Sequence, residues 1–387
     1  MRSGSPLFNI FRIEKEDIVH HRLNRPGIAF LFIALALGAL AGCHLNSVSG
    51  PTVTTGLLYM TDTYTGKVWT YDPSSNTESS TSLVSTNQNS TGPIYFYNGI
   101  GYIAVGSYEN TAPGVYYFNP SASVPTAVQV GTTSASAQSA QYIAFYSSTK
   151  AYVSVANYSG SASTQGVYTF NPSNPNAGLA GPIAGTSGST MYLQGIVVGP
   201  DGMIYVANSS TELSGTDEVL QINPANNSVT VLSYTPSAPG TTALASGSYG
   251  TANGVFVGNI SYNSVTYAPQ GSIDFINTST LKPSTGLETT AAAASIVYIS
   301  NGNGSLLTTD TNDWYVYPNL SAGGTLSASY SGAGNAIAAS TNNIYVSNAV
   351  YGGSPSSTIS VYTTSGASTG TSIGPITGQC LANLAFH

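Results

Sequence analysis

Side chains that could carry out chemistry are scarce in this chain of 387 residues. The chain has two cysteines and four histidines, and beyond residue 56 the only examples are Cys380 and His387. A serine or cysteine nucleophile activated by imidazole needs a histidine in the body of the fold. The sequence therefore gives no support to such a nucleophile or to a multi-histidine zinc or copper site. We expect Cys380, in an apolar run, to be buried and inert.

Carboxylates and amides are the remaining candidates, and they recur at regular spacing after short apolar runs. The recurring positions are Asp62, Asn157, Asn208, Asn259, Asp310 and Asn348. In a ring around one axis, their oxygens could hold calcium, which prefers oxygen ligands. The interpretation that we favour is that each side chain ends a strand and hydrogen-bonds its own turn.

The segment Asp310-Thr311-Asn312-Asp313 has some likeness to a calcium-binding loop. Its candidate metal ligands are Asp310, Asn312 and Asp313. The flanking glycine and the distal glutamate of the EF-hand pattern are missing, so we expect a solvated loop, with calcium as the alternative. Glu212, Asp217 and Glu218 form a second acidic group, which we interpret as a polar rim.

The charge balance excludes one class of partner. Beyond residue 42 the chain has three lysines, no arginine and twelve acidic residues, which gives a net charge of −9. Nucleic-acid binding depends on lysine and arginine to neutralise phosphates. We therefore expect no nucleic-acid partner.

The regular spacing comes from a repeat of roughly 50 residues, whose clearest copy is Gly195–Leu232. Four short runs rich in Val, Ile and Tyr are separated there by turn residues such as Pro200-Asp201-Gly202 and Pro224–Asn227. Such runs indicate strands. Four antiparallel strands in about 40 residues make one propeller blade.

The third strand of the repeat gives the clearest register, with two large apolar residues three positions apart. The copies are Val68/Tyr71, Val115/Phe118, Val167/Phe170, Val219/Ile222, Ile273/Ile276, Trp314/Tyr317 and Ile359/Tyr362. The sequence thus predicts an all-β fold, a single propeller over residues 57–387 with seven four-stranded blades. Six or eight blades are the alternatives, because the fifth and sixth units are degenerate.

The two ends of the repeat region are complementary. Leu57 begins directly at a second strand, whereas Cys380–His387 has the pattern of a first strand without its blade. We predict that this last strand completes the first blade and closes the ring, which leaves no long free edge.

The runs Tyr205-Val206-Ala207-Asn208 and Tyr345-Val346-Ser347-Asn348 resemble the signature of the YVTN family of β-propeller repeats, which is related to NHL-type repeats. The resemblance covers Leu57 to His387, although Val255–Asn259 departs from the signature. It implies an extracellular or surface propeller, a class with varied roles.

The N-terminal region predicts export. Ile28–Leu40 is an apolar run of 13 residues that follows several basic residues, as in a signal peptide. Leu40-Ala41-Gly42-Cys43 resembles a bacterial lipobox, which implies cleavage of residues 1–42 and lipidation of Cys43 with acyl chains such as palmitate. Residues 43–56 would form a lipidated tether, and His44 in place of aspartate implies sorting to the outer membrane. The alternative is an uncleaved anchor with a chance cysteine.

These observations together predict a monomeric, lipid-anchored propeller of the cell envelope. We interpret it as a non-catalytic binding or scaffold module without a cofactor, with a protein or polysaccharide partner. Tyrosines expected in loops (Tyr108, Tyr158, Tyr249, Tyr262 and Tyr351) among Ser, Thr and Asn suit such a surface, unless the composition is simply that of a low-charge exported protein. The alternative function is a calcium-dependent hydrolase or lactonase that uses carboxylates in the central channel.

Overall fold

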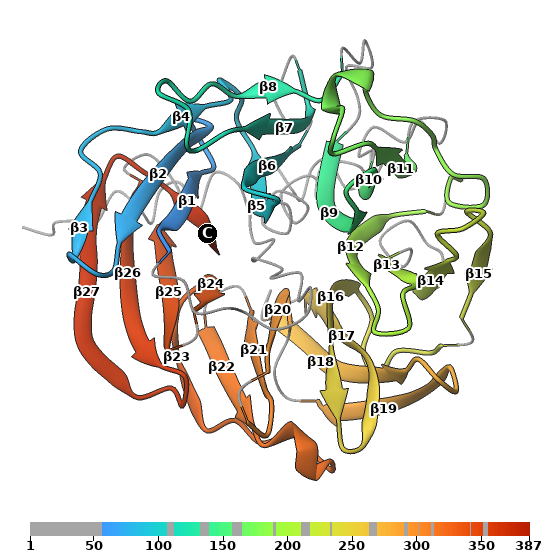
Figure 1. Cartoon of the computed structure of the whole chain (residues 1–387). Helices are drawn as coiled ribbons and strands as arrows, with labels where there is room; N and C mark the ends of the chain where they lie inside the picture. Colours follow the sequence, from blue (N-terminus) through green and yellow to red (C-terminus); the bar gives the residue numbers. More distant parts are fainter. Residues whose placement is uncertain are drawn as a thin grey trace, which may run out of the picture.

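The chain folds into a ring of seven antiparallel sheets around a central axis (Figure 1). The computed structural model describes residues 56–106, 112–131, 139–156, 165–188, 191–209, 217–232, 234–262, 269–289, 293–300, 302–310, 313–340, 342–350 and 355–387. Helical structure in these ranges is limited to two short 3₁₀ turns, Pro175–Ala177 and Leu320–Ala322. The predicted all-β, seven-bladed propeller is confirmed.

Each blade has the same strand order from the axis outward. The inner strands are β28 (Leu381–Phe386), β5 (Thr91–Tyr97), β9 (Ser139–Ser147), β12 (Leu193–Val198), β16 (Thr241–Tyr249), β20 (Ser295–Ile299) and β24 (Ala336–Ala339). The second strands are β1 (Leu58–Asp62), β6 (Ile100–Val105), β10 (Lys150–Ala156), β13 (Ile204–Asn208), β17 (Ala252–Tyr262), β21 (Ser305–Thr309) and β25 (Asn343–Val350). The third strands are β2 (Lys67–Asp72), β7 (Gly114–Phe118), β11 (Gly166–Phe170), β14 (Glu218–Ile222), β18 (Pro269–Asn277), β22 (Asp313–Pro318) and β26 (Ser356–Thr363).

The outer strands vary more than the others. They are β3 (Thr77–Glu78), β8 (Val128–Gln129), β15 (Val229–Val231), β19 (Lys282–Glu288), β23 (Tyr330–Ala333) and β27 (Ser368–Thr377). In the first blade β4 (Val84–Ser85) also pairs with β2. In the third blade the outer strand is reduced to a single bridge between Thr169 and Ala180.

The predicted third-strand register is confirmed in all seven blades, and its physical basis is burial on both faces. Residues three apart on a strand point to opposite faces. Accordingly, Val219 packs in the cluster shared with the fifth blade, whereas Ile222 packs in the cluster shared with the third. Trp314 and Tyr317 are likewise divided between the two seams of the sixth blade. Most of the core therefore lies between blades.

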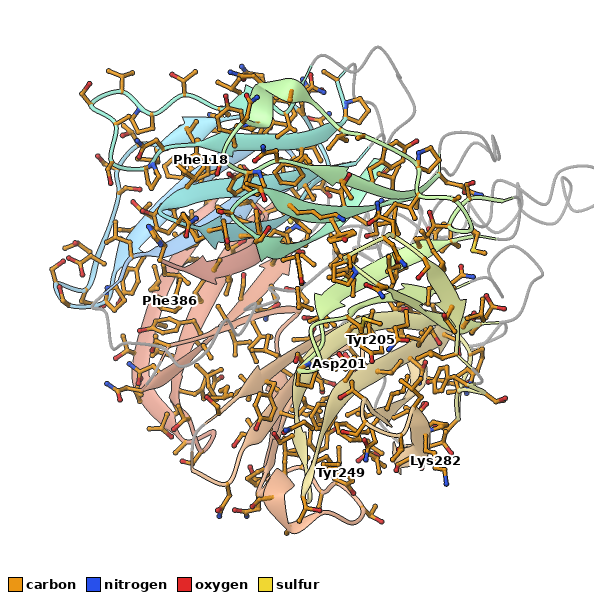
Figure 2. All side chains as sticks on the ribbon, turned by 45° about the vertical axis from the view of Figure 1, so that its right-hand side comes forward. Phe118, Asp201, Tyr205, Tyr249, Lys282 and Phe386 are labelled. Atoms are coloured by element: carbon orange, nitrogen blue, oxygen red, sulfur yellow. The ribbon has the colours of Figure 1, made fainter. Side chains whose placement is uncertain are left out.

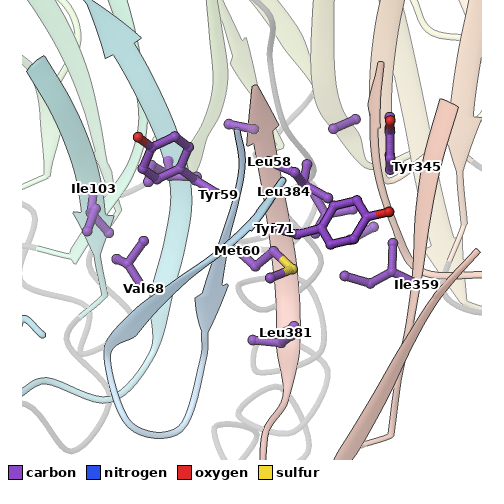
Figure 3. Packing of buried hydrophobic residues seen from close by; sticks show 14 of the residues in the cluster. Leu58, Tyr59, Met60, Val68, Tyr71, Ile103, Tyr345, Ile359, Leu381 and Leu384 are labelled. Atoms are coloured by element: carbon purple, nitrogen blue, oxygen red, sulfur yellow. The ribbon is translucent and has the colours of Figure 1, made fainter. Parts of the chain in front are cut away.

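The predicted closure of the ring is also confirmed. Strand β28 pairs antiparallel with β1, with Leu58 opposite Phe386 and Thr61 opposite Asn383. Beyond the strands, Leu57 and His387 exchange backbone hydrogen bonds of 2.8 and 3.1 Å. Figure 3 shows Leu381 and Leu384 from the last strand beside residues of the first blade, in one cluster. Cys380 is buried, as expected.

Aromatic pairs join neighbouring blades near the far ends of the inner strands. Tyr345 of the seventh blade lies 4.7 Å from Phe386 of the first, measured between ring centroids. The His387 ring stacks on Phe96 of the second blade at 4.4 Å, and Tyr97 stacks on Phe145 of the third at 4.7 Å. Such pairs add to the stabilisation that burial of their area provides. Aromatic pairs of this kind therefore stabilise three consecutive contacts between blades, from the seventh blade to the third.

Candidate functional site

The seven inner strands, which the structure describes in full, contain no Asp, Glu, Lys, Arg or His. Their longest polar side chains are amides: Gln141, Gln194 and Asn383. All three are at least nine-tenths buried. The strands nearest the axis therefore offer hydrogen bonds but no acid, base or carboxylate ligand.

Five of the seven inner strands carry a register irregularity near their start, beside the end of the second strand. The residues at these irregularities are Gly92-Pro93, Gln141, Gln194-Gly195, Thr242 and Ala382. Bulges redirect side chains and often occur next to functional sites. In this propeller the redirected groups are small or amide side chains without charge.

The described members of the recurring Asp and Asn set lie at or directly after the ends of the second strands, one strand away from the axis. Each directly follows the second-strand residue that pairs with the first large residue of the third strand, as Asn208 follows Ala207 opposite Val219; the set is Asp62, Asn208, Asn259, Asp310 and Asn348. The predicted member from the third blade is out of register. Ser154 pairs with Val167 as Ala207 pairs with Val219, so the equivalent residue there is Val155. Asn157, which the regular spacing had singled out, comes two positions later in the sequence and lies outside the described residues.

Asp62 is engaged by its own turn. Its Oδ1 accepts the backbone N–H of Tyr64 at 3.0 Å, and its Oδ2 accepts the Thr65 hydroxyl at 2.6 Å. The side chain is 1% exposed. This arrangement matches the turn-capping interpretation, since a carboxylate at a strand end satisfies the N–H groups that follow it.

Asp310, a candidate calcium ligand, caps a tight hairpin. Its Oδ1 accepts the backbone N–H of Asp313 at 2.7 Å, and its Oδ2 accepts the Tyr315 hydroxyl at 3.2 Å. Burial and, secondarily, the charge of Asp310 raise the pKa of Asp313. The third candidate, Asn312, lies outside the described residues. Within the ranges that the structure describes, no three Asp, Glu, His or Cys side chains are grouped as a metal site requires.

The other equivalent positions have different partners. The Asn208 Oδ1 accepts the backbone N–H of Tyr192 at 2.8 Å, and its amide donates to Glu218 at 3.3 Å. Asn348 is exposed. The described members of the set thus differ in their surroundings and in their hydrogen-bond partners.

The buried polar network around Asp274 was not predicted from the sequence. Asp274, on β18, has no exposed surface. It accepts hydrogen bonds from the Tyr234 hydroxyl at 2.6 Å, the Asn259 amide at 2.8 Å and the Gly286 N–H at 2.6 Å. Ser237 also donates to it. The single acid within the run Ile273–Ile276 was the available signal, because a buried carboxylate requires several donors.

This network fixes the connection between the fourth and fifth blades. Tyr234 and Ser237 lie in that connection, and Asp217 accepts the Gly240 N–H at its end at 2.6 Å. Burial, and then the charge of Asp274, raise the pKa of Tyr234 far above its usual range. The hydroxyl therefore stays protonated and acts as a donor. Asp217, one of the acids expected at a polar rim, is instead buried, at 2% exposure.

Lys150 joins the third and fourth blades. Its Nζ donates to the Pro224 carbonyl at 2.7 Å and to Asn227 Oδ1 at 2.8 Å, and it lies 5.3 Å from the centroid of the Tyr152 ring. Burial lowers the pKa of Lys150. One of the three lysines beyond residue 42 therefore has a structural role in the contact between two blades.

The tyrosines expected in loops are placed differently. Tyr249 ends β16 and Tyr262 ends β17, so both lie in strands of the fifth blade, in two different hairpins. Figure 2 shows Tyr249 toward the edge of the ring. Tyr108, Tyr158, Tyr351 and Glu212 lie outside the described residues. Glu218 begins β14 rather than lying in a loop.

Fold and side chains define the class: a seven-bladed β-propeller whose inner strands are uncharged. Three solved propellers are similar to it in fold. Apo AztD from Citrobacter koseri is 13% identical, with a TM-score of 0.50 over 87% of this chain and 98% of that chain. The periplasmic gluconolactonase PpgL from Pseudomonas aeruginosa is 13% identical, with a TM-score of 0.53 over 86% and 98%. The dihydro-heme d1 dehydrogenase NirN is 10% identical, with a TM-score of 0.52 over 88% and 78%.

At these identities the likeness concerns the fold alone. No protein-family model and no curated protein matches the sequence. In the part of the chain that the structure describes, no helix has the length and apolar character needed to cross a membrane.

Proposed function

We propose that this chain is a lipid-anchored propeller of the cell envelope that acts as a non-catalytic binding or scaffold module for protein or glycan partners. The observation that supports this proposal most strongly is the absence of charged residues from the seven fully described inner strands. General acid–base and metal chemistry need groups that can change or balance charge. A surface of hydroxyls and amides suits recognition by hydrogen bonds.

The use of the described carboxylates points in the same direction. Asp62 and Asp310 accept donors from their own turns, and Asp274 accepts several donors in the interior. A carboxylate whose oxygens are engaged in this way would have to break these bonds to bind calcium or activate water. Each such group has a structural role that accounts for its position.

The anchor and the family are further parts of the proposal. The lipobox-like run Leu40–Cys43 would be cleaved before Cys43, and the acyl chains would hold the protein at the outer membrane. Repeats resembling the YVTN signature are in keeping with a surface or periplasmic propeller. Cys43→Ser should release the protein from membranes and abolish labelling by a fatty-acid analogue. Unchanged membrane retention would contradict the anchor.

The non-catalytic part of the proposal is tested by calorimetric titration of calcium into the purified, chelator-treated protein. We expect no heat and no change in melting temperature. Binding tighter than about micromolar would indicate a preorganised carboxylate site of the kind found in calcium sensors and would contradict the proposal.

The second candidate is a calcium-dependent hydrolase or lactonase. It is favoured by the proximity of two carboxylates, Asp310 and Asp313, since burial and the Asp310 charge raise the pKa of Asp313. A bound cation would relieve this repulsion. Lactone hydrolysis that requires calcium and is lost in Asp310→Asn, but not in Asp72→Asn, would establish this alternative.

A further inference from the structure

A small hollow lies between the sixth and seventh blades. It has a volume of about 220 Å³ and is lined by Asn303, Gly304, Ser305, Pro318, Asn319, Thr364 and Ser365. These residues come from the β20–β21 turn, the segment after β22 and the β26–β27 turn. Strand β21 connects this hollow, at Ser305, with the Asp310 hairpin at its other end. The hollow is therefore on the opposite face of the ring from the Asp and Asn positions.

The lining offers neutral hydrogen-bonding groups and no charge. Two amides and three hydroxyls contribute both donors and acceptors. The amide of Asn303 donates to Asn319 Oδ1 at 3.2 Å. This bond engages one donor of Asn303 and one acceptor of Asn319, so each side chain keeps further hydrogen-bonding capacity.

The wall of the hollow that the sixth blade contributes is held in place by its own backbone hydrogen bonds. Backbone bonds join Leu320 N–H to the Gly304 carbonyl at 3.2 Å and Ser321 N–H to the Asn303 carbonyl at 2.9 Å. Asn319 has a φ of 61°, a conformation that asparagine tolerates better than most residues. A preorganised wall reduces the entropy that binding must overcome.

The side chain of Tyr298 packs against this wall, at Gly304. A Cβ at Gly304 would lie 3.0 Å from the Tyr298 hydroxyl, so the phenol packs directly against this lining glycine. The Tyr298 ring is itself fixed. It stacks on Phe256 at 6.1 Å, and the missing side chain of Gly247 leaves room for it.

We propose that this hollow binds a single sugar unit of a neutral glycan. Sugar hydroxyls both donate and accept, as do the lining amides and hydroxyls. An anionic ligand would find no cation among the lining residues, and an apolar one would leave these groups without partners. The volume is below the range of about 300–1,000 Å³ typical of pockets for larger ligands, which fits one ring. This inference rests on the proposed binding role and specifies its partner.

Saturation-transfer NMR on the purified full chain tests the inference. The neutral probes are D-glucose, D-galactose, N-acetyl-D-glucosamine, maltotriose and chitotriose, and the charged probes are D-glucuronate and D-glucosamine. Ser365→Trp places a large ring in the hollow from an exposed turn. Ser279→Trp, in the corresponding exposed turn of the fifth blade, is the matched control.

We expect saturation transfer to at least one neutral probe, weakened about tenfold in affinity by Ser365→Trp, a change of about 1.4 kcal/mol, and unchanged by Ser279→Trp. Equal melting temperatures of the two variants would show that folding is not the cause. Transfer to no neutral probe, preference for a charged one, or equal effects of both tryptophans would overturn the inference. These outcomes leave the calcium titration unaffected, so failure of this glycan site and failure of the proposed non-catalytic role are distinguishable.

Discussion

The hydroxyl of Ser347 donates a hydrogen bond of 2.6 Å to the backbone carbonyl of Leu381, joining the seventh blade to the strand that closes the first. The same ladder position recurs elsewhere. Ser154 donates to the Gln194 carbonyl at 2.6 Å, and Thr61 donates to the Gly92 carbonyl at 3.3 Å. One repeat position therefore connects each of three blades to the inner strand of the next.

Replacing this hydroxyl should weaken the ring. In Ser347→Ala the buried Leu381 carbonyl loses its side-chain donor, so we expect the free energy of unfolding to fall by about 1–2 kcal/mol. Denaturant unfolding of the variant measures the loss. Ser372→Ala, at an exposed serine of β27, is the control and should change stability little. Equal stabilities of the two variants would show that the seam bond is energetically unimportant.

The closing strand should carry a large share of the packing at this seam. Leu384 has no exposed surface and packs among residues of the first blade (Figure 3). Leu384→Ala should therefore cost about 2–5 kcal/mol, as for other buried leucines. The matched variant Val350→Ala, at a residue 49% exposed, should leave the melting temperature nearly unchanged. A similar small shift in both would mean that the strand is held by its backbone alone.

Tyr234→Phe probes the buried network. The change removes the donor at 2.6 Å from the Asp274 carboxylate. Hydrogen bonds to charged groups contribute about 1.5–3 kcal/mol, and we expect a loss of stability in this range. Tyr146→Phe, at a tyrosine 44% exposed, is the control. If Tyr234→Phe is as stable as this control, the carboxylate must have another donor in place of the hydroxyl.

Stability should depend on pH through His387. Partial burial lowers the pKa of this imidazole, so the folded chain takes up a proton less readily than the unfolded chain. The folded state therefore has its full stability above the unfolded pKa of about 6.5 and loses part of it as the pH falls below that value. His387→Phe keeps an aromatic ring beside Phe96 and should flatten this dependence between about pH 7.5 and 5.5. Denaturant unfolding midpoints at these two pH values measure the pH dependence. The same change in midpoint for the original protein and for His387→Phe would contradict the prediction.

The features that could be predicted are those that a strand pattern encodes directly. The apolar residues Val219 and Ile222 predicted a strand because both faces of that strand are buried. The segment Cys380–His387 predicted closure of the ring because it has the pattern of a first strand that is followed by no second strand. Position in a ladder is encoded less directly. The regular spacing pointed to Asn157, whereas the ladder position equivalent to Asn208 in the third blade is Val155.

The polar features needed three-dimensional information. Asp274 meets Tyr234 and Ser237 across 40 and 37 residues of chain, and the hollow combines three turns from two blades. No local pattern marks such encounters. The tyrosines Tyr249 and Tyr262 were expected in loops, but β16 and β17 extend far enough to include them.

Closure by a late strand has a consequence for how the chain is made. Asp62 and its seam partner Cys380 are separated by 318 residues, so the first blade lacks its inner strand until almost the whole chain has been synthesised. The other six blades can each form from a contiguous segment. A contact this distant in sequence is slow to form, and it keeps β1 unpaired on one side until the end. The first blade is therefore the last of the seven to be completed.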